Sequence, residues 1–379
     1  MKRERHNDDE KEDRLSNLSE CVLLHILSFL NATQAVQTCI LSKRWNNLWK
    51  LLPTLRLSSW YFYTMNDFTQ YTTKILSLRD HSTALYYLRF SIEGMVEPQP
   101  LETILNCAVS QNLKRLRIFL YYYSIHIPDC IFSCHTLTSL KLYIRHPITT
   151  PLFPNSLNLP ALTNLSLTRF EFHSRDGRAE PFSALEKLSS LTIRFCKVFD
   201  AENLSISSAT LTNLTIQTKE ELNYGKIELS TPNLSTFAYA VIYPKSLYLR
   251  LFRYSASETL WSMSNLSSVK LVTIYGHNNK LSESGNISLV LLNWLIELAN
   301  IESLIVSLNT LKVLSLVPDL LKVEFASLYR LKSLKVKYCS SASIPKEIMN
   351  FLLQNAPSAS AYLRFFINLI ILFLSRFFG

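Results

Sequence analysis

A short apolar pattern recurs along most of the chain and constrains its fold more than any other feature. The pattern is Leu-x-x-Leu-x-Leu, with other apolar residues allowed at each position. Its regular copies begin at Leu85, Leu113, Leu137, Leu162, Leu188, Leu211 and Leu234. From Leu113 to Leu234 the copies start 24, 25, 26, 23 and 23 residues apart. Spacings of this size indicate a repeated supersecondary unit that stacks on its neighbours.

Each copy predicts one β-strand with a core side and an outer side. In the copy at residues 137–142, Leu140 and Leu142 face the core and Lys141 faces outward, because side chains alternate along a strand. One strand cannot bury its apolar side alone, but a stack of them makes a continuous core beneath a parallel sheet. We therefore predict an α/β fold, a leucine-rich-repeat solenoid over residues 81–343 with its parallel sheet on the concave face.

The pattern is less regular after Leu234. Weaker copies begin at Leu266, Ile301, Leu311 and Leu331. Their uneven spacing indicates insertions or degenerate repeats, and residues 245–265 are the expected departure from regular geometry.

The C-terminal end carries two further segments. Residues 344–361 predict a short amphipathic helix that caps the solenoid, because the last repeat must hide its open end. Residues 362–379 form an atypical hydrophobic tail. Only 11 residues lie between Arg364 and Arg376, whereas a membrane-spanning helix needs about 20. A tail anchor would therefore require the arginines to lie at the interfaces of a thinned bilayer, and we instead expect an altered C-terminus that packs on the solenoid or aggregates, with no membrane partner.

Residues 13–55 carry three short helical patterns. The apolar faces are Val22, Leu23, Ile26, Leu27 and Leu30 in the first, Ala35, Val36, Cys39 and Ile40 in the second, and Leu41, Trp45, Leu48, Trp49 and Leu52 in the third. Asn31 or Thr33 can cap the second pattern, and Pro53 ends the third. So small a unit has more apolar residues than its core can hide, which indicates a permanent partner. Plain packing against the rest of the chain is the alternative.

These residues resemble a known motif. The phrases DRLSNL, ECVLLHILSFL and AVQTCILSKRWNNLWKLLPTL are similar to the F-box of plant F-box/leucine-rich-repeat proteins, some of which carry a C-terminal FBD region. Together with the repeats, the resemblance extends to about Ala361. It implies a three-helix F-box that docks onto the Skp-type adaptor of an SCF ubiquitin ligase and, through it, a cullin.

The resemblance also implies which side chains contact the adaptor: Leu15, Leu18, Leu23, Leu24, Leu27 and Trp45. One position departs from the family pattern, since Ser19 stands where proline usually follows Leu18. Serine also begins helices well, so we expect at most weakened adaptor binding.

Composition argues against several other classes. Glycine is scarce, at 6 residues, and the sequence contains none of the common catalytic or phosphate-binding motifs, so we expect neither an enzyme nor a cofactor. The seven cysteines are scattered without zinc-site spacing, which indicates reduced thiols in a cytoplasmic or nuclear protein and no metal. Residues 1–12 are a charged tail that predicts disorder and no signal peptide, and residues 56–80 predict an aromatic and polar connector.

The outward position of each copy predicts what the concave face can bind. In chain order it is occupied by Arg89, Arg117, Lys141, Ser166, Thr192, Thr215, Ala238, Lys270, Ile305, Ser315 and Lys335. The first three would form a row of cations, flanked by Arg115 and Tyr143, that captures an acidic or phosphorylated segment. Solvated polar positions on an exposed sheet face are the alternative. The net charge of +10 also suits nucleic acid, but no nucleic-acid-binding module accompanies it.

We therefore predict a non-catalytic adaptor that brings a protein substrate to a ubiquitin ligase. One alternative is a repeat scaffold that is uncoupled from the ligase. Another is a small-molecule receptor, which would need a deep pocket ringed by several repeats.

Overall fold

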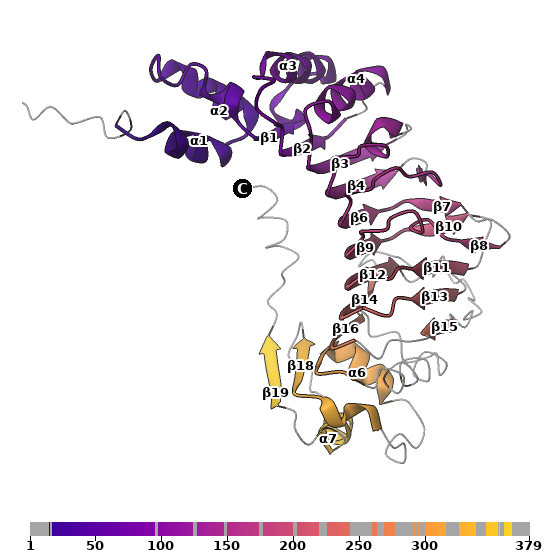
Figure 1. The fold of residues 1–379 in the computed structure, drawn as a ribbon. Coiled ribbons are helices and arrows are strands. Elements are labelled where there is room, and N and C mark those ends of the chain that lie inside the picture. The colour runs from indigo at the N-terminus through magenta and orange to yellow at the C-terminus, as the bar shows by residue number, and fades with distance from the viewer. Residues whose placement is uncertain are drawn as a thin grey trace, which may run out of the picture.

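The protein forms an arc whose inner wall is a single parallel sheet (Figure 1). This computed structural model describes residues 15, 17–94, 98–123, 127–147, 150–173, 177–199, 203–219, 226–242, 260–263, 269–276, 292, 295, 300–315, 326–338, 346–354, 356 and 360–365. The sheet has 12 strands in the order β1-β2-β3-β4-β6-β9-β12-β14-β16-β17-β18-β19. A helical N-terminal region thus leads into a parallel-strand solenoid, which confirms the predicted fold class.

The N-terminal region begins with helix α1 (Glu20–Ser28) and helix α2 (Ala32–Gln37). Asn31 caps α2 as predicted, because its side chain accepts a hydrogen bond from the backbone N–H of Gln34 while the Gln34 side chain accepts one from the backbone N–H of Asn31. The core of this region is built from Leu23, Leu27, Ala32, Ala35, Trp45, Leu48, Trp49 and Leu52.

The third helical pattern is not an α-helix, so that prediction was wrong. Helix α2 tightens into the 3₁₀ turn η1 (Thr38–Ile40), residues 41–47 form turns, and a second 3₁₀ turn, η2 (Leu48–Leu51), follows. The backbone bonds here join residues three apart, such as Trp45 N–H to the Ser42 carbonyl at 3.1 Å. A 3₁₀ turn has three residues per turn instead of 3.6, so it rotates Ile40 and Leu41 to the surface.

The first strand of the sheet starts directly after this region. Strand β1 (Thr54–Ser58) pairs in parallel with β2 (Tyr87–Ile92), and between them lie the 3₁₀ turn η3 (Ser59–Tyr61) and helix α3 (Met65–Leu78). The segment predicted as a connector therefore supplies part of a strand and a covering helix. Helix α3 packs against α4 (Pro98–Val109) on the outer side of the first strands (Figure 1).

A buried arginine joins the helical region to the first repeats. The Arg79 side chain is 2% exposed and donates to the Leu52 carbonyl at 2.6 Å and to Gln111 Oε1. Leu52 ends the helical region, Arg79 ends α3, and Gln111 lies just beyond α4. The helical region and the solenoid therefore share one core.

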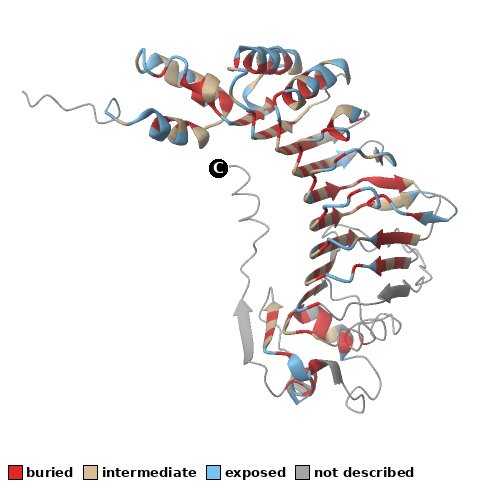
Figure 2. Ribbon diagram, in the orientation of Figure 1, coloured by how far each residue is buried: buried red, intermediate tan, exposed pale blue. Residues whose placement is uncertain are grey.

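The regular repeats have the predicted register. Their strands are β3 (Arg115–Tyr123), β4 (Ser139–Pro147), β6 (Asn164–Thr168), β9 (Ser190–Arg194), β12 (Asn213–Lys219) and β14 (Thr236–Ile242). Buried and half-buried residues alternate along them, so bands of buried residues run from strand to strand (Figure 2). The leucines of the pattern are the buried members, as in Leu140 and Leu142 at 1% exposure.

Hydroxyl groups reinforce the stacking of these strands. In the five copies from Leu137 to Leu234, the second residue donates its side-chain hydroxyl to a backbone carbonyl of the preceding repeat, as Thr163 does to Thr138 and Thr212 does to Ser189, both at 3.0 Å. The same contact recurs at Thr138, Ser189 and Ser235.

Two smaller parallel sheets form the outer layer of the arc (Figure 1). One contains β5 (Leu152–Phe153), β7 (Glu171–His173) and β10 (Lys197–Phe199), and the other contains β8 (Arg178–Ala179), β11 (Asn203–Ser207), β13 (Lys226–Ser230) and β15 (Leu260–Met263). A 3₁₀ turn, η4 (Asp129–Ile131), occupies the outer layer before β4. Ion pairs across strands, such as Lys197 with Glu171, lie on this layer.

The irregular part of the array differs from the prediction at two copies. Strand β16 (Leu271–Gly276) belongs to a copy that begins at Val269 and not at Leu266. The strand register shows this, because Ala238, the fifth residue of the copy at Leu234, pairs with Thr273. The copy predicted at Leu311 is helix α6 (Leu308–Leu314), capped by the Ser307 hydroxyl, which accepts from the Thr310 N–H at 3.1 Å.

The described part of the C-terminal end contains three more strands of the sheet and a helix. Strands β17 (Ser303–Ser307) and β18 (Ser333–Tyr338) match the copies at Ile301 and Leu331, with the 3₁₀ turn η7 (Ala326–Arg330) before β18. Helix α7 (Lys346–Gln354) confirms the predicted C-terminal helix. It does not end the array, because β19 (Ser360–Phe365) adds a final strand beside β18.

Three predicted segments lie outside the described residues: the charged tail at 1–12, most of the irregular segment at 245–265, and the hydrophobic tail beyond residue 365. Among the helices that the structure describes, none has the length and apolar character to cross a bilayer. The described His, Cys, Asp and Glu residues form no group of three that could hold a metal ion.

Candidate interaction surfaces

Helix α1 presents an apolar stripe to solvent. Val22, Ile26 and Phe29 are spaced by four and three residues, which places them on one face of the helix. Val22 is 40% exposed and Phe29 is 64% exposed, and the His25 ring lies edge-on to the Phe29 ring at 4.9 Å. The buried residues Leu23 and Leu27 form the adjacent, core-facing side of the same helix.

The turn after α2 adds more exposed apolar surface. Ile40 is 87% exposed and Leu41 is 59% exposed, and Leu15, ahead of α1, is 51% exposed. Large apolar side chains that remain outside the core of so small a unit are typical of a protein-binding surface. We call these five side chains, Leu15, Val22, Phe29, Ile40 and Leu41, the exposed apolar set.

Most of the six residues predicted to contact an adaptor are buried or partly buried, so they do not belong to the exposed apolar set. Leu23, Leu27 and Trp45 are buried in the core, with exposures of 0%, 0% and 5%. Leu18 and Leu24 are partly buried and pack against that core. Only Leu15 of the predicted six belongs to the exposed apolar set.

Ser19 sits at the N-cap of α1 as the sequence indicates. Its side chain makes no capping bond to the helix, and its hydroxyl lies 2.9 Å from the Cys21 thiol. The chain before the helix is held by Arg44, whose guanidinium donates to the Leu18 carbonyl. The start of α1 is therefore fixed by a residue of the later turns.

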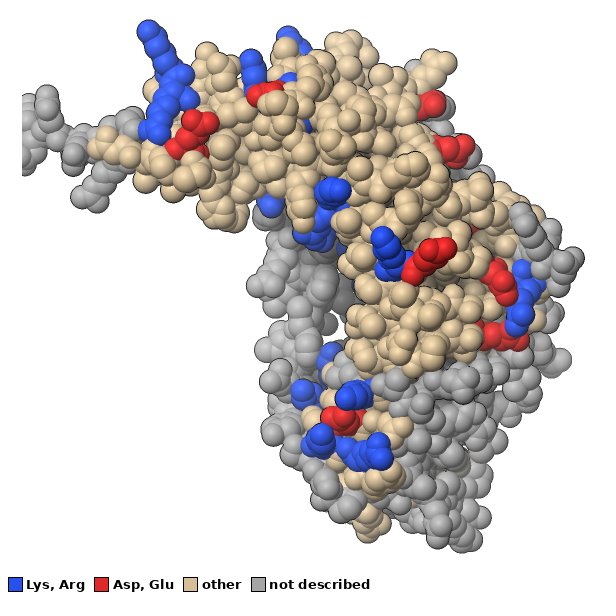
Figure 3. Space-filling model, viewed as in Figure 1, with Lys and Arg blue, Asp and Glu red and all other residues tan. Residues whose placement is uncertain are grey.

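A row of cations crosses the first four strands of the sheet on its concave face. The strand register places Arg56 beside Arg89, Arg89 beside Arg117, and Arg117 beside Lys141. We call these four residues the cationic column. The sequence pattern identified three of them and missed Arg56, whose strand lay inside a segment predicted to be helical and then connecting. In Figure 3, basic atoms are visible on the inner side of the arc beneath the first strands.

Two aromatic rings lie within the column. The Arg115 and Arg117 guanidinium carbons lie 5.8 and 5.6 Å from the centre of the Tyr87 ring. The Arg89 guanidinium carbon and the Lys141 ammonium lie 5.0 and 5.5 Å from the centre of the Phe119 ring. Each ring thus carries two cations, and cation–π attraction of this kind stabilises both side chains. We call Tyr87 and Phe119 the aromatic platforms.

The predicted residue Tyr143 supports this arrangement from the neighbouring strand. Its ring centre lies 5.7 Å from that of Phe119. Phe119 is 7% exposed, and Tyr143 and the two cations are among the side chains that contact it. The structure therefore brings all five predicted substrate-binding residues, Arg89, Arg115, Arg117, Lys141 and Tyr143, to one area of the concave face.

Burial and the neighbouring positive charges lower the pKa of the lysine in this area. Burial, followed by the charges of Arg194, Arg117 and Arg89, lowers the pKa of Lys141 to about 8. Glu93 lies at the edge of the area, where burial raises its pKa and Arg145 acts in the opposite direction. Burial also raises the pKa of Tyr121, whose ring is 5.2 Å from the Arg145 guanidinium carbon.

Beyond Lys141, the middle of this row is small and neutral. In the strand register, Lys141 is followed by Ser166, Thr192, Thr215, Ala238, Thr273, Ile305 and Lys335. Thr273 replaces the predicted Lys270, whose ammonium instead lies 3.5 Å from Glu302. Ser315, predicted for the copy at Leu311, follows helix α6 and is not in this row.

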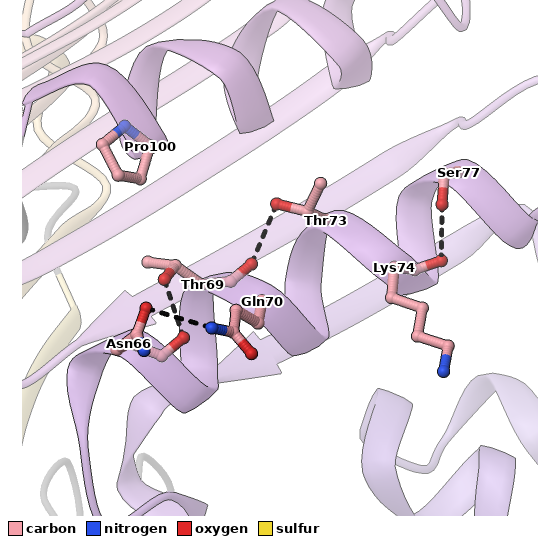
Figure 4. Close-up of a pocket in the computed structure, with 7 residues that line it drawn as sticks. All are labelled: Asn66, Thr69, Gln70, Thr73, Lys74, Ser77 and Pro100. Atoms are coloured by element: carbon pink, nitrogen blue, oxygen red, sulfur yellow. Dashed lines mark hydrogen bonds between the residues drawn. The ribbon is translucent and has the colours of Figure 1, made fainter.

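A shallow depression lies elsewhere, on helix α3 (Figure 4). Its volume is about 490 Å³, and it is lined by Asn66, Thr69, Gln70, Thr73, Lys74, Ser77 and Pro100. Its polar side chains bond within their own helix, as Thr73 does to the Thr69 carbonyl at 2.9 Å (Figure 4). The depression lies on the outer side of the arc, and it is not the pocket ringed by several repeats that a small-molecule receptor would need.

Comparison with known proteins agrees with these features. Residues 15–57 match the F-box domain family. An F-box/FBD/LRR-repeat protein of Arabidopsis thaliana is 28% identical over 59% of this chain and 52% of its own length. A second F-box/FBD/LRR-repeat protein of that plant is 26% identical over 89% of this chain and 74% of its own length, and an F-box/LRR-repeat protein is 26% identical over 80% of both chains.

The chain thus spans about half the length of the first of these relatives and more of the other two. The F-box match falls on the N-terminal helices, and the similarity to the relatives continues into the parallel strands. Together, these comparisons show that the N-terminal helices match the F-box family and that most of the chain is similar to plant F-box/leucine-rich-repeat proteins.

Proposed function

We propose that this chain is the substrate-recognition subunit of an SCF-type ubiquitin ligase. The F-box would dock a Skp-type adaptor and, through it, a cullin scaffold, while the repeats hold a protein substrate. The chain itself would perform no chemical step. It would act by raising the effective concentration of substrate lysines near a ubiquitin-loaded enzyme.

The observation that carries this proposal is the exposed apolar set on the F-box. A helical unit that matches the F-box family leaves five large apolar side chains outside its core. Burying such side chains against a partner would contribute about 25 cal/mol for each Å² of apolar surface removed from water. A protein partner that covers these side chains would explain why these exposed positions are apolar.

The structure also suggests how the adaptor contacts divide. We assign direct contact to the exposed apolar set, together with the partly buried Leu18 and Leu24. Leu23, Leu27 and Trp45 would act indirectly, because they hold α1 and the following turns in the shape that presents the set. Replacing Leu23 or Leu27 by alanine would therefore test folding as much as binding.

The experiment is a titration of a purified plant Skp-type adaptor with the full chain, read by calorimetry. The test variant is Val22→Glu with Ile40→Glu, which places two charges on the exposed apolar set. The matched control is Leu152→Glu with Tyr329→Glu, at two apolar side chains of the repeats that are 47% and 54% exposed. We expect the test variant to bind at least tenfold more weakly and the control to bind like the unmodified chain.

Two results would contradict the proposal. Unchanged binding by the test variant would remove the assigned contact surface. No binding by the unmodified chain would favour a repeat scaffold that is uncoupled from the ligase, and Ser19→Pro would then show whether the departure at Ser19 is the cause.

We also infer a cytoplasmic or nuclear location, since the six cysteines that the structure describes are all free thiols.

A further inference from the structure

We propose that the cationic column and its aromatic platforms bind an extended protein segment that carries Asp or Glu at alternate positions. This inference rests on the proposed function, because it names the class of substrate that the repeats would hold. It concerns the concave face alone, so it can fail while the F-box proposal stands.

The spacing of the column fits such a segment. Adjacent strands of a sheet lie about 4.8 Å apart, so the three steps from Arg56 to Lys141 cover about 14 Å. An extended peptide rises about 3.3 Å per residue, and side chains on one of its sides recur about every 6.6 Å. Three acidic side chains at positions i, i+2 and i+4 therefore cover about 13 Å. A peptide that runs across the strands would set three carboxylates against four cations.

The way the cations are held favours several single charges over one phosphate. A phosphate group is bound where several donors converge on one point. Here the cations are distributed between two platforms, with Arg115 and Arg117 on Tyr87, and Arg89 and Lys141 on Phe119. The positive charge is thus spread along the column, which suits a row of carboxylates.

Repulsion between neighbouring cations favours the binding of anions to this surface. Lys141 on β4 is faced by Arg117 on β3, Arg89 on β2 and Arg194 on β9, and all three disfavour its charged form. A carboxylate placed over this group would offset the repulsion. Other titratable groups of this area are Tyr143 on the same strand, Tyr87 on β2, Arg115 and Tyr121 on β3, Arg145 on β4, and Glu93 beyond β2.

This geometry predicts that binding is linked to proton uptake. Lys141 is partly neutral near pH 8, and a bound carboxylate favours its protonated form. Affinity should therefore fall as the pH rises from 7 to 9. In the Lys141→Arg variant, a guanidinium that stays charged throughout this range should bind with little dependence on pH.

The test uses the full chain and three fluorescent peptides, read by anisotropy at 0.15 M salt and pH 7. The first alternates Glu and Ser, the second has the same composition with its glutamates in one block, and the third carries a single phosphoserine. We expect the alternating peptide to bind at least fivefold more tightly than either of the others. Arg117→Glu with Lys141→Glu should weaken it at least tenfold.

A control variant separates this site from the overall charge of the chain. Lys74→Glu with Lys187→Glu makes the same change of charge at two exposed lysines outside the column. This variant should bind the alternating peptide within twofold of the unmodified chain. Equal weakening by both variants would show non-specific attraction to a chain of net charge +10 and would overturn the proposal.

Other results would overturn it as well. Tighter binding of the phosphoserine peptide, or of a single-stranded oligonucleotide used in the same assay, would assign the surface to a different class of ligand. The same pH dependence in Lys141→Arg and the unmodified chain would remove Lys141 from the site. Adaptor titration with the Arg117→Glu, Lys141→Glu variant distinguishes the two proposals, because intact adaptor binding there shows that only the concave face has been changed.

Discussion

Replacing Arg79 by methionine should destabilise the F-box from a position outside it. The Arg79 guanidinium is buried and donates both to the Leu52 carbonyl, where the F-box helices end, and to Gln111 Oε1 beyond α4. Methionine has a similar length and fills most of the same space, but it cannot donate a hydrogen bond. The substitution thus removes the polar link between the F-box and the first repeats and preserves most of the packing.

The size of the effect follows from these two bonds. Hydrogen bonds to a charged group contribute about 1.5–3 kcal/mol each, so their loss costs roughly 3–6 kcal/mol. Removing a buried cation recovers part of this, because the folded protein no longer has to desolvate it. We expect a net loss of about 3 kcal/mol in the free energy of local unfolding, which corresponds to roughly a hundredfold loss of hydrogen-exchange protection.

Hydrogen exchange read by mass spectrometry measures this for each peptide of the chain. Protection should fall both in peptides from α1 to η2 and in peptides from α3 and α4, because Arg79 links all of these elements. Lys187→Met, which removes a charge at an exposed position, should leave protection unchanged. A loss confined to α3 and α4, or a change below about 0.5 kcal/mol, would refute the view that the F-box and the repeats share one cooperative core.

Three further predictions concern separate parts of the chain. Lys141→Met should raise the melting temperature at pH 7. Because the folded-state pKa of Lys141, about 8, lies below its unfolded value, the unmodified chain should gain stability as the pH rises from 8 to 10, and this gain should be smaller in the variant. Alkylation followed by mass spectrometry should modify the exposed Cys21 first and leave Cys130 and Cys196 unmodified, since burial raises their pKa values to about 11 and about 12. Asn31→Ala should lower the stability of the F-box by about 1 kcal/mol in urea titration, because it removes the capping box of α2, and an unchanged midpoint would contradict this.

The regular repeats could be predicted from sequence because two signals coincide there. Apolar residues alternate along each strand, and the strands recur at a nearly constant spacing. The copies from Leu113 to Leu234 place their leucines on the core side, and the predicted neighbours Arg89, Arg117 and Lys141 are confirmed as cross-strand partners. What such a surface binds does not follow from the pattern and stays a prediction.

Sequence reasoning failed where two patterns share the same apolar residues. LPTLRL, residues 52–57, is itself a copy of the repeat, but Leu52 also completes a helical spacing with Leu48. Because Leu52 was assigned to a helix, strand β1 was not predicted, and Arg56 was therefore missing from the predicted row of cations. At Leu311 the error ran the other way, since Leu308, Leu311 and Leu314 satisfy a short helix as well as a strand copy. The start only ten residues after Ile301 leaves too little chain for a complete repeat, which takes about 20–29 residues.

The position of the C-terminal strand was missed for a different reason. Residues 360–365 contain the alternation Ala361, Leu363 and Phe365, but the apolar residues that follow made the whole segment look like one tail. Its pairing with β18 shows that the hydrophobic stretch begins inside the sheet.

Because β1 follows the F-box helices directly, the position of the sheet relative to these helices is fixed. Leu52 ends the F-box core, β1 begins two residues later, and Arg56 of that strand donates to the Phe29 carbonyl at 3.1 Å. Each later strand therefore lies about 4.8 Å farther from the F-box helices along the sheet. If the repeats hold a substrate, moving its binding residues from one strand to another would change which of its lysines come within reach of ubiquitin, even where the affinity stayed the same.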